Sequence, residues 1–364
     1  MLSHKASAVV RLRYFDLPLH TAYAQAKEIA LAQAAVPLLT AGSLQTEERS
    51  GGKFVYRYRY DASGRRINEY LGAATDPQTA VKAERAREEI AEQAAIAEHS
   101  RRLRKIGFYS ADNSTLVTVA SLFNAGVFGG GGVLVGTHAY GAILNELGVL
   151  ASPFPMTEDV DVASGRSIEL AALPQGGLLA LLRQTGLPFH EVPALERGGP
   201  ATSFKVRGRN LKVDLLVPAR GKPYVPVLVP ELDAHAIALP YLQYLLRSTI
   251  SSVLIGRDRI VPVTVPHPGW FCLHKLALYA LRTGAENPKR EKDVYQGAAL
   301  AMALAHKQDF LLIEAIESMD SKLKAAIRPG VERALSLIGE DQPEVASLLG
   351  PYGGRRRYAR SSKR

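Results

Sequence analysis

Three aspartates in two short apolar segments are the residues of this chain best suited to chemistry. Asp159 and Asp161 stand in the segment TEDVDV, and Asp214 stands in KVDLL. In a β-strand alternate side chains point to the same face, so Asp159 and Asp161 would project together, with Cα atoms about 7 Å apart. Carboxylates this close repel each other unless a positive charge lies between them. We therefore predict a divalent cation at this position.

Magnesium is the cation that this pattern favours, because Mg²⁺ prefers oxygen ligands and binds carboxylates together with substrate phosphates. A third carboxylate, from Asp214, would complete a site for two Mg²⁺ ions, with Mn²⁺ as the alternative ion. Such a pair of ions holds the attacking and leaving oxygens in phosphoryl transfer. The competing interpretation is that aspartates at strand ends cap turns or pair with surface arginines.

A glycine-rich segment lies upstream of the aspartates. Residues 129–132 are glycines, followed by the apolar run VLV and then by Gly136 and Thr137. This order indicates a glycine loop, a short strand and a helix that begins near Gly136. Backbone N–H groups and a hydroxyl at such a junction can hold phosphate oxygens. The alternative is a flexible turn without a ligand. The spacing fits neither a dinucleotide fingerprint nor a P-loop.

The order of these motifs resembles the DNA polymerase β-type nucleotidyltransferase superfamily over residues 115–305. In that superfamily Gly-Gly or Gly-Ser is followed by Asp-hydrophobic-Asp/Glu and by a third acid on a later strand. The resemblance implies that Asp159, Asp161 and Asp214 are catalytic metal ligands. It also implies that Gly136 and Thr137 bind the nucleotide. This sequence departs from the pattern in having Thr137 at the second glycine-motif position, and in a longer gap before Asp159.

The C-terminal part supplies a second group of candidates. The segment WFCLHKLALY is apolar except for His274 and Lys275. With the later segment KREKDVYQ, it resembles the C-terminal portion of a bacterial nucleotidyltransferase family of uncharacterised and toxin-like proteins. The resemblance implies that Lys275 and Lys292 bind the triphosphate. The alternative for Lys275 is a salt bridge to a core carboxylate. For Lys292 it is a surface ion pair with Asp293 or Glu291. We expect His274 to be packed or hydrogen-bonded rather than catalytic.

The first hundred residues look separate from the catalytic pattern. Residues 54–60 alternate aromatic side chains with Val and Arg, and residues 65–71 complete a predicted hairpin. Aromatic rings stack on bases and guanidinium groups bind phosphate, so the hairpin suits nucleic acid. Its candidate nucleic-acid-binding residues are Arg57, Arg59, Arg65 and Arg66. The alternative, which we prefer, is that the tyrosines are buried on a neighbouring helix and the arginines are merely solvated.

The strands and helices expected around these candidate residues indicate an α+β fold. A polymerase β-like nucleotidyltransferase core, a mixed sheet flanked by helices, would occupy residues 111–265. A helical and β-hairpin extension over residues 1–110 would precede it. Residues 266–350 indicate a helical domain, and residues 351–364 a disordered basic tail.

Composition limits the class of protein. The 364 residues are 47% hydrophobic and 22% charged, and the net charge of +10 favours anionic partners, including nucleic acid. The chain has no long apolar run typical of a membrane helix, and its only cysteine, Cys272, has no internal partner. We expect its N-terminus to be a poor secretory signal, because no sustained apolar run follows it. We expect a cytoplasmic protein without membrane association.

These observations predict a metal-dependent nucleotidyltransferase that moves an NMP from an NTP, with ATP among the candidates, to a hydroxyl acceptor and releases pyrophosphate. RNA, such as a tRNA 3′ end, is favoured over protein as the acceptor, and a toxin-like role is open. The alternatives are a catalytically silent nucleic-acid-binding protein and an antitoxin-like partner on the same core. The sequence leaves the base preference and the oligomeric state open.

Overall fold

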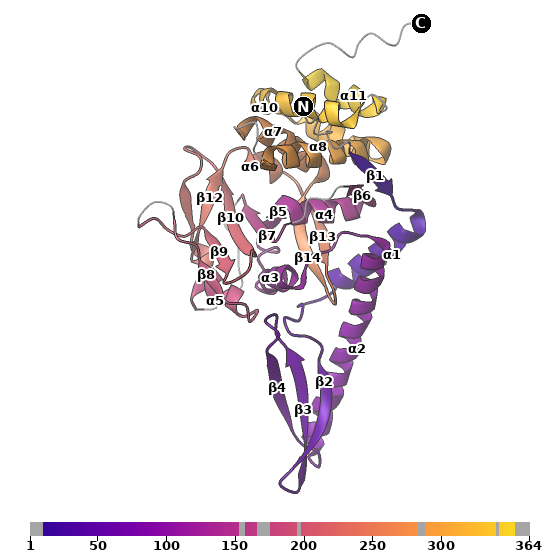
Figure 1. Ribbon diagram of the computed structural model, residues 1–364, viewed down its shortest axis with the longest axis vertical. Coiled ribbons are helices and arrows are strands. Elements are labelled where there is room, and N and C mark those ends of the chain that lie inside the picture. Colours follow the sequence, from indigo (N-terminus) through magenta and orange to yellow (C-terminus); the bar gives the residue numbers. More distant parts are fainter. Residues whose placement is uncertain are drawn as a thin grey trace, which may run out of the picture.

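The computed structural model describes residues 10–152, 157–165, 175–194, 198–282, 288–339 and 342–353. Within these ranges the chain forms the predicted mixed α+β structure. A central sheet is flanked by helices, a smaller sheet with one long helix extends from one end of the molecule, and further helices gather at the other end (Figure 1). The predicted basic tail, from residue 354 onward, lies outside the described residues.

The central sheet has the strand order β11-β12-β10-β7-β5, and β9 and β8 continue from β10. Its strands are β5 (Gly132–Val135), β7 (Asp159–Ser164), β8 (Phe189–Glu191), β9 (Ser203–Val206), β10 (Lys212–Pro218), β11 (Pro226–Val229) and β12 (Ala234–Leu239). Strands β7 and β10 run parallel, and β5 runs antiparallel to β7. This pairing brings the first residues of β7 and β10 beside the last residue of β5.

Alternation along β7 and β10 separates core residues from site residues. Val160, Val162 and Val213 are almost completely buried, whereas the aspartates between them are partly exposed. The apolar side chains pack toward helix α3 (Asn113–Asn124), which is itself buried along most of its length. Because side chains alternate between the two faces of a strand, burying the valines leaves the aspartates together on the other face.

The region from residue 242 to residue 353 follows the prediction of a β-rich end and then helices. It contains α6 (Leu242–Leu245), the hairpin β13 (Thr249–Ile255) and β14 (Ile260–Pro266), α7 (Pro268–Leu281), α8 (Pro288–Lys307), α9 (Asp309–Glu317), α10 (Ser321–Ile338), α11 (Pro343–Leu349) and the 3₁₀ turn η2 (Gly350–Tyr352). A second 3₁₀ turn, η1 (Pro230–Leu232), joins β11 to β12. Helix α7 packs between α8 and α10, which covers its apolar surface.

The N-terminal part shares a core with the rest of the molecule. Strand β1 (Arg11–Tyr14) pairs with β6 (Val149–Ser152), which follows α4 (Gly136–Leu147). Helices α1 (Leu17–Leu31) and α2 (Pro77–Ile106) contribute to one apolar cluster with hairpin β13–β14. Residues on both sides of the predicted boundary at residue 110 therefore pack together.

The predicted hairpin is part of a three-stranded sheet. Strands β3 (Gly52–Tyr60) and β4 (Arg66–Ala73) pair as expected, and β2 (Ser43–Arg49) adds a strand on the other side of β3. Helix α2 packs on the face that carries Val55 and Leu71. The interpretation that the tyrosines are buried on a helix is therefore wrong: the face with the arginines lies on α2, and the face with the tyrosines points away.

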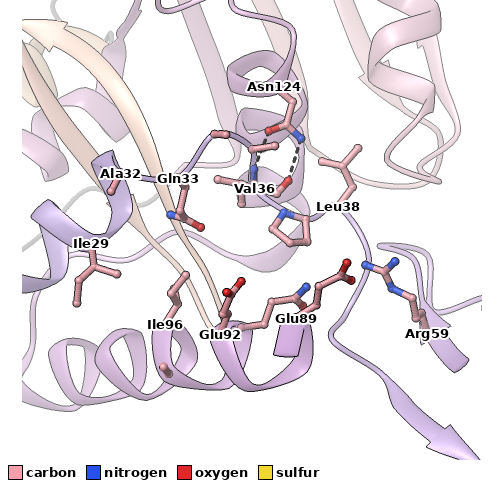
Figure 2. A pocket seen from close by; sticks show the side chains of 15 residues that line it. Ile29, Ala32, Gln33, Val36, Leu38, Arg59, Glu89, Glu92, Ile96 and Asn124 are labelled. Carbon is pink, nitrogen blue, oxygen red and sulfur yellow. Dashed lines mark hydrogen bonds between the residues drawn. The ribbon is translucent and has the colours of Figure 1, made fainter. Parts of the chain in front are cut away.

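A groove of about 770 Å³ lies where the small sheet and its helix join the core (Figure 2). It runs between the end of α1, residues 32–38 and α2. Asn124 of α3 fixes the connecting segment, since its side chain accepts a hydrogen bond from the Val36 N–H and donates one to the Val36 carbonyl, both at 2.8 Å. Among the described residues, no helix combines the length and apolarity needed to span a membrane.

Candidate active site

The three predicted aspartates lie at one end of the paired strands β7 and β10. Asp161 is opposite Asp214 in the parallel pairing, and Asp159 is opposite Lys212. On the other side of β7, Val135 at the end of β5 is opposite Asp161. The aspartates line one cavity of about 260 Å³ together with Gly136 and Thr137. The structure thus brings together all five residues that the first two motifs predicted.

Gly136 is required by its position between β5 and α4. Its φ of +70° lies in the left-handed region, which side chains other than glycine rarely adopt. A Cβ at this residue would also collide with the Oδ2 of Asp161. Helix α4 begins at Gly136, and the first N–H groups of a helix have no partner within it. The positive end of α4 therefore starts directly against the Asp161 carboxylate.

Asp161 is the most perturbed carboxylate of the site. Burial, followed by the negative charges of Asp214 and Asp159, raises its pKa to about 7. The nearby ammonium groups of Lys275 and Lys212 act in the opposite direction without cancelling these effects. The cavity is therefore short of positive charge at Asp161, and a cation bound there would relieve the repulsion.

Asp214 already has polar partners. The Ser203 hydroxyl donates to its Oδ1 at 2.5 Å, and the Lys212 Nζ lies 2.7 Å from its Oδ2. Burial works against the Lys212 charge, but the hydrogen bond and the negative charge of Asp214 prevail and raise the pKa of Lys212. Sequence reasoning missed both partners. Lys212 could have been predicted, because it stands two residues before Asp214 and alternate residues of a strand lie on the same face.

The chemistry of this donor set fits a hard divalent ion, although its side chains do not form a cage. As placed, the described residues contain no group of three or more His, Cys, Asp or Glu side chains that could hold a metal ion. The Asp214 oxygens are directed at Ser203 and Lys212 instead. Mg²⁺ nevertheless prefers carboxylate oxygens and retains waters, so a site with one or two direct protein ligands is typical of it.

Cationic side chains from α7 and α8 line the cavity opposite the aspartates. Lys275 is almost fully buried, and its Nζ lies 2.8 Å from Oδ1 of the buried Asp293. The Arg282 Nε lies 2.5 Å from the other oxygen of Asp293. Burial opposes ionisation of Asp293, but the charges of Lys275 and Arg282 lower its pKa. The salt bridge from Lys275 to a core carboxylate, given above as the alternative, is thus present in the structure.

Comparison with known proteins identifies the family. A family described as nucleotidyltransferase matches residues 114–320, more than half of the chain and the whole of the cavity just described. The chain belongs to this nucleotidyltransferase family. Among solved structures, a nucleotidyltransferase-like antigenic protein from Paracoccidioides brasiliensis is 16% identical, with a TM-score of 0.30 over 62% of this chain and 92% of that chain. No curated protein matches the chain. The toxin-like subfamily suggested by the sequence stays a prediction.

Lys292 lines the cavity of this nucleotidyltransferase without the surface ion pair that was its alternative. Asp293 is engaged by two other cations, and Glu291 lies 2.8 Å from Arg333. No described carboxylate forms an ion pair with Lys292. Burial and the charge of Lys275 lower the pKa of Lys292. A half-buried ammonium that lacks a close counter-charge is suited to a phosphate oxygen.

His274 is one of the residues that line the cavity of the nucleotidyltransferase. Its ring is buried, and burial together with the charge of Lys275 lowers its pKa to about 3. The imidazole is therefore neutral near neutral pH and poorly suited to exchange a proton with a substrate. The expectation that His274 is packed or hydrogen-bonded rather than catalytic stays a prediction.

The four hairpin arginines that were predicted to bind nucleic acid lie in different surroundings. Arg57 is buried, and its Nη1 lies 2.6 Å from Oε2 of Glu89 on α2. Arg59 is half-buried and donates to a backbone carbonyl. Arg65 and Arg66 are exposed. A nucleic acid that approached the sheet would therefore reach Arg65 and Arg66 directly, but not the guanidinium of Arg57.

Proposed function

We propose that this nucleotidyltransferase transfers an NMP from an NTP to a hydroxyl group, with RNA favoured over protein as the acceptor. One observation carries the proposal: a single cavity is lined by carboxylates of β7 and β10, by lysines of α7 and α8 with Arg282 at the end of α7, and by the start of α4. Carboxylates beside a cationic wall suit a metal–triphosphate complex, because each wall complements one component of it.

In this proposal Asp159, Asp161 and Asp214 would hold Mg²⁺, with Mn²⁺ as the alternative ion and Asp161 as the likelier shared ligand. Bound Mg²⁺ would neutralise the phosphates and lower the pKa of the acceptor hydroxyl. Lys212, which contacts Asp214, also lines the cavity and would be within it to meet a phosphate oxygen.

The chain's own groups position the reactants. Gly136 and Thr137 at the start of α4 hold triphosphate oxygens through N–H groups and a hydroxyl. The acceptor oxygen forms a bond to the α-phosphorus while the bond from that phosphorus to the bridging oxygen breaks, and pyrophosphate leaves. Asp214 either ligates the ion at the acceptor hydroxyl or takes the proton of that hydroxyl. Lys292 and Lys275 stabilise the negative charge that builds up on the departing pyrophosphate.

RNA is favoured as the acceptor because of charge. The chain has a net charge of +10, and its last ten residues are RRRYARSSKR. A basic surface attracts a phosphate backbone, whereas a protein hydroxyl acceptor needs no such excess.

The test is a transfer assay with purified protein, Mg²⁺, each α-³²P-labelled NTP in turn, and a mixture of cellular RNA and protein. We expect label that RNase removes and protease leaves in place, and we expect Asp161→Ala to abolish it. Asp309→Asn, which changes an exposed carboxylate on α9, is the matched control and should keep full transfer. Label that only protease releases would leave the transfer reaction standing and make protein the acceptor. Full transfer by Asp161→Ala would overturn the proposal.

A toxin-like role would appear as a separate result. Expression of the active chain would arrest growth, and Asp161→Ala would relieve the arrest because it removes transfer without removing the protein. Arrest that Asp161→Ala does not relieve would show that any toxicity is independent of nucleotide transfer.

A further inference from the structure

The three-stranded sheet carries a surface that the catalytic cavity does not use. One face of β3 presents alternate aromatic rings, and the strand pairing places Tyr70 of β4 directly opposite Tyr56. We call this surface the aromatic face, and it consists of Phe54, Tyr56, Tyr58, Tyr60 and Tyr70. In Figure 1 the sheet lies at the end of the molecule away from the C-terminal helices, with α2 along one side.

The aromatic face is not needed to bury the core of the sheet. Leu44, Val55 and Leu71 project from the opposite face and pack on alanines of α2. Two of the tyrosines remain open to solvent, with Tyr70 56% and Tyr60 46% exposed. Phe54 and Tyr56 are partly exposed beside them, and a contiguous exposed apolar patch on a folded protein marks a binding surface.

The rings form a continuous platform. The Tyr56 and Tyr70 ring centroids are 5.3 Å apart, and those of Tyr56 and Tyr58 are 6.1 Å apart with planes inclined by 17°. Phe54 extends the row, with its centroid 6.2 Å from that of Tyr70. Tyr58 is buried within this row, Phe54 and Tyr56 are partly exposed, and Tyr70 is its most exposed ring.

Guanidinium groups accompany the rings. The Arg66 Cζ lies 4.8 Å from the Tyr58 centroid, and the Arg49 Cζ lies 5.3 Å from the Tyr56 centroid. A carboxylate beside them, that of Glu47, accepts a hydrogen bond from the Tyr58 hydroxyl and pairs with Arg49. The charge of Glu47 is therefore balanced by Arg49. Among the described residues, no carboxylate forms an ion pair with Arg66. The platform combines π-faces with cations at its margin.

We propose that the aromatic face binds single-stranded RNA and holds the acceptor of the transfer reaction. Unpaired bases can stack on the rings, while Arg66 and Arg49 bind the phosphates between them. A duplex hides its base faces, so it could use only the arginines. A protein partner would gain less, because its backbone supplies neither flat faces for the rings nor phosphates for the guanidiniums. The role in transfer rests on the proposed function, whereas binding by itself does not.

The sheet and the cavity lie apart along the molecule (Figure 1). The aromatic face would therefore hold a segment of the acceptor away from its reacting end. Loss of the platform should raise the KM for RNA and leave kcat almost unchanged, since the groups at the reacting phosphate stay in place.

The experiment measures binding by the full chain without NTP and with EDTA present, so that it does not depend on catalysis. Fluorescence anisotropy compares a labelled single-stranded RNA with a blunt RNA duplex of the same length. We expect the single strand to bind more tightly. Tyr70→Ala should weaken binding of the single strand about tenfold, whereas Tyr70→Phe should bind like the parent because stacking needs the ring and not the hydroxyl.

Two further variants separate stacking from other causes. Phe310→Ala removes an aromatic ring that is 61% exposed on α9 and should bind RNA normally. Arg66→Gln should lower the slope of the logarithm of affinity against the logarithm of salt concentration by about 0.7, the contribution of one phosphate on a single strand.

Three results would overturn the inference: equal affinity for the single strand and the duplex, unchanged affinity of Tyr70→Ala in a folded protein, or a weakened Tyr70→Phe. Transfer to a protein acceptor that Tyr70→Ala impairs, with no RNA bound, would assign the face to a protein partner. These outcomes are independent of Asp161→Ala. If that variant keeps transfer while Tyr70→Ala loses RNA affinity, the proposed function fails and the binding surface stands.

Discussion

The cavity and the aromatic face use the same strand alternation in opposite ways. In the cavity, charged side chains are buried and bind one another, as Lys275 and Arg282 bind Asp293. On the aromatic face, Tyr70 and Arg66 are exposed. The comparison teaches that the charged residues of the cavity also stabilise the fold, whereas the exposed residues of the aromatic face contribute little to folding and can bind a partner. Substitutions should therefore cost stability in the first region and binding in the second.

The largest loss of stability should come from Asp293→Asn. This change leaves Lys275 buried without its carboxylate, and removing one member of a buried ion pair costs about 3–5 kcal/mol. Denaturant unfolding at neutral pH would measure it. Glu291→Gln is the control, because Glu291 pairs with Arg333 at the surface, and it should cost less than about 1 kcal/mol. Equal losses would contradict the view that the cavity charges stabilise the fold.

The next effect separates backbone strain from contact with the catalytic carboxylate. Gly136→Ala adds a Cβ that collides with Asp161, whereas Gly208→Ala has a similar positive φ and open space around it. Gly208→Ala should cost about 1 kcal/mol of unfolding free energy and leave transfer intact. Gly136→Ala should cost more and lower kcat at least about 100-fold, because it displaces Asp161. Equal transfer rates for the two variants would show that the contact is unimportant.

Arg57 of β3 and Arg66 of β4 allow the same comparison within the small sheet. Arg57→Gln should destabilise the protein by about 1–3 kcal/mol, since it leaves the Ala41 carbonyl without its donor and removes the closer of the two arginines that pair with Glu89. Arg66→Gln should change stability by less than about 0.5 kcal/mol. Thermal unfolding of both variants beside the RNA titration would check this. We expect Arg57→Gln to lower stability and Arg66→Gln to lower RNA affinity. Equal stability losses in the two variants would contradict this.

The smallest effect is a gain in stability. The pKa of Asp161 is raised to about 7, so between its ordinary value and 7 the folded state keeps a proton that the unfolded state has lost. In EDTA the parent should therefore lose stability as pH rises toward 7. Asp161→Asn removes this loss and should be about 1–2 kcal/mol more stable than the parent at pH 8, after allowance for solvent screening. Unfolding curves at pH 5 and pH 8 would measure it, and an identical pH dependence of the two proteins would contradict it.

The site was more predictable than the surface of the sheet. Valines alternate with aspartates in β7 and β10, so one periodic pattern indicated both the buried face and the convergence of the carboxylates. Strand β3 has bulky side chains on both faces, and nothing in residues 54–60 shows which face α2 covers. Strand β2 was missed because its sequence, SLQTEER, is almost wholly polar. The Lys275–Asp293 pair depends on how α7 packs against α8, which local sequence does not determine.

The central claim is that the aspartates of β7 and β10 bind metal together with the nucleotide. Equilibrium dialysis with Mn²⁺ and a non-hydrolysable NTP analogue tests it most directly, because it counts bound ions without relying on an acceptor. We expect two ions per parent chain and at most one in Asp161→Asn, with Asp309→Asn equal to the parent. Two results would contradict the account. One is a parent protein that binds only the Mn²⁺ ion carried by the phosphates of the analogue, and the other is an Asp161→Asn variant that binds as many ions as the parent.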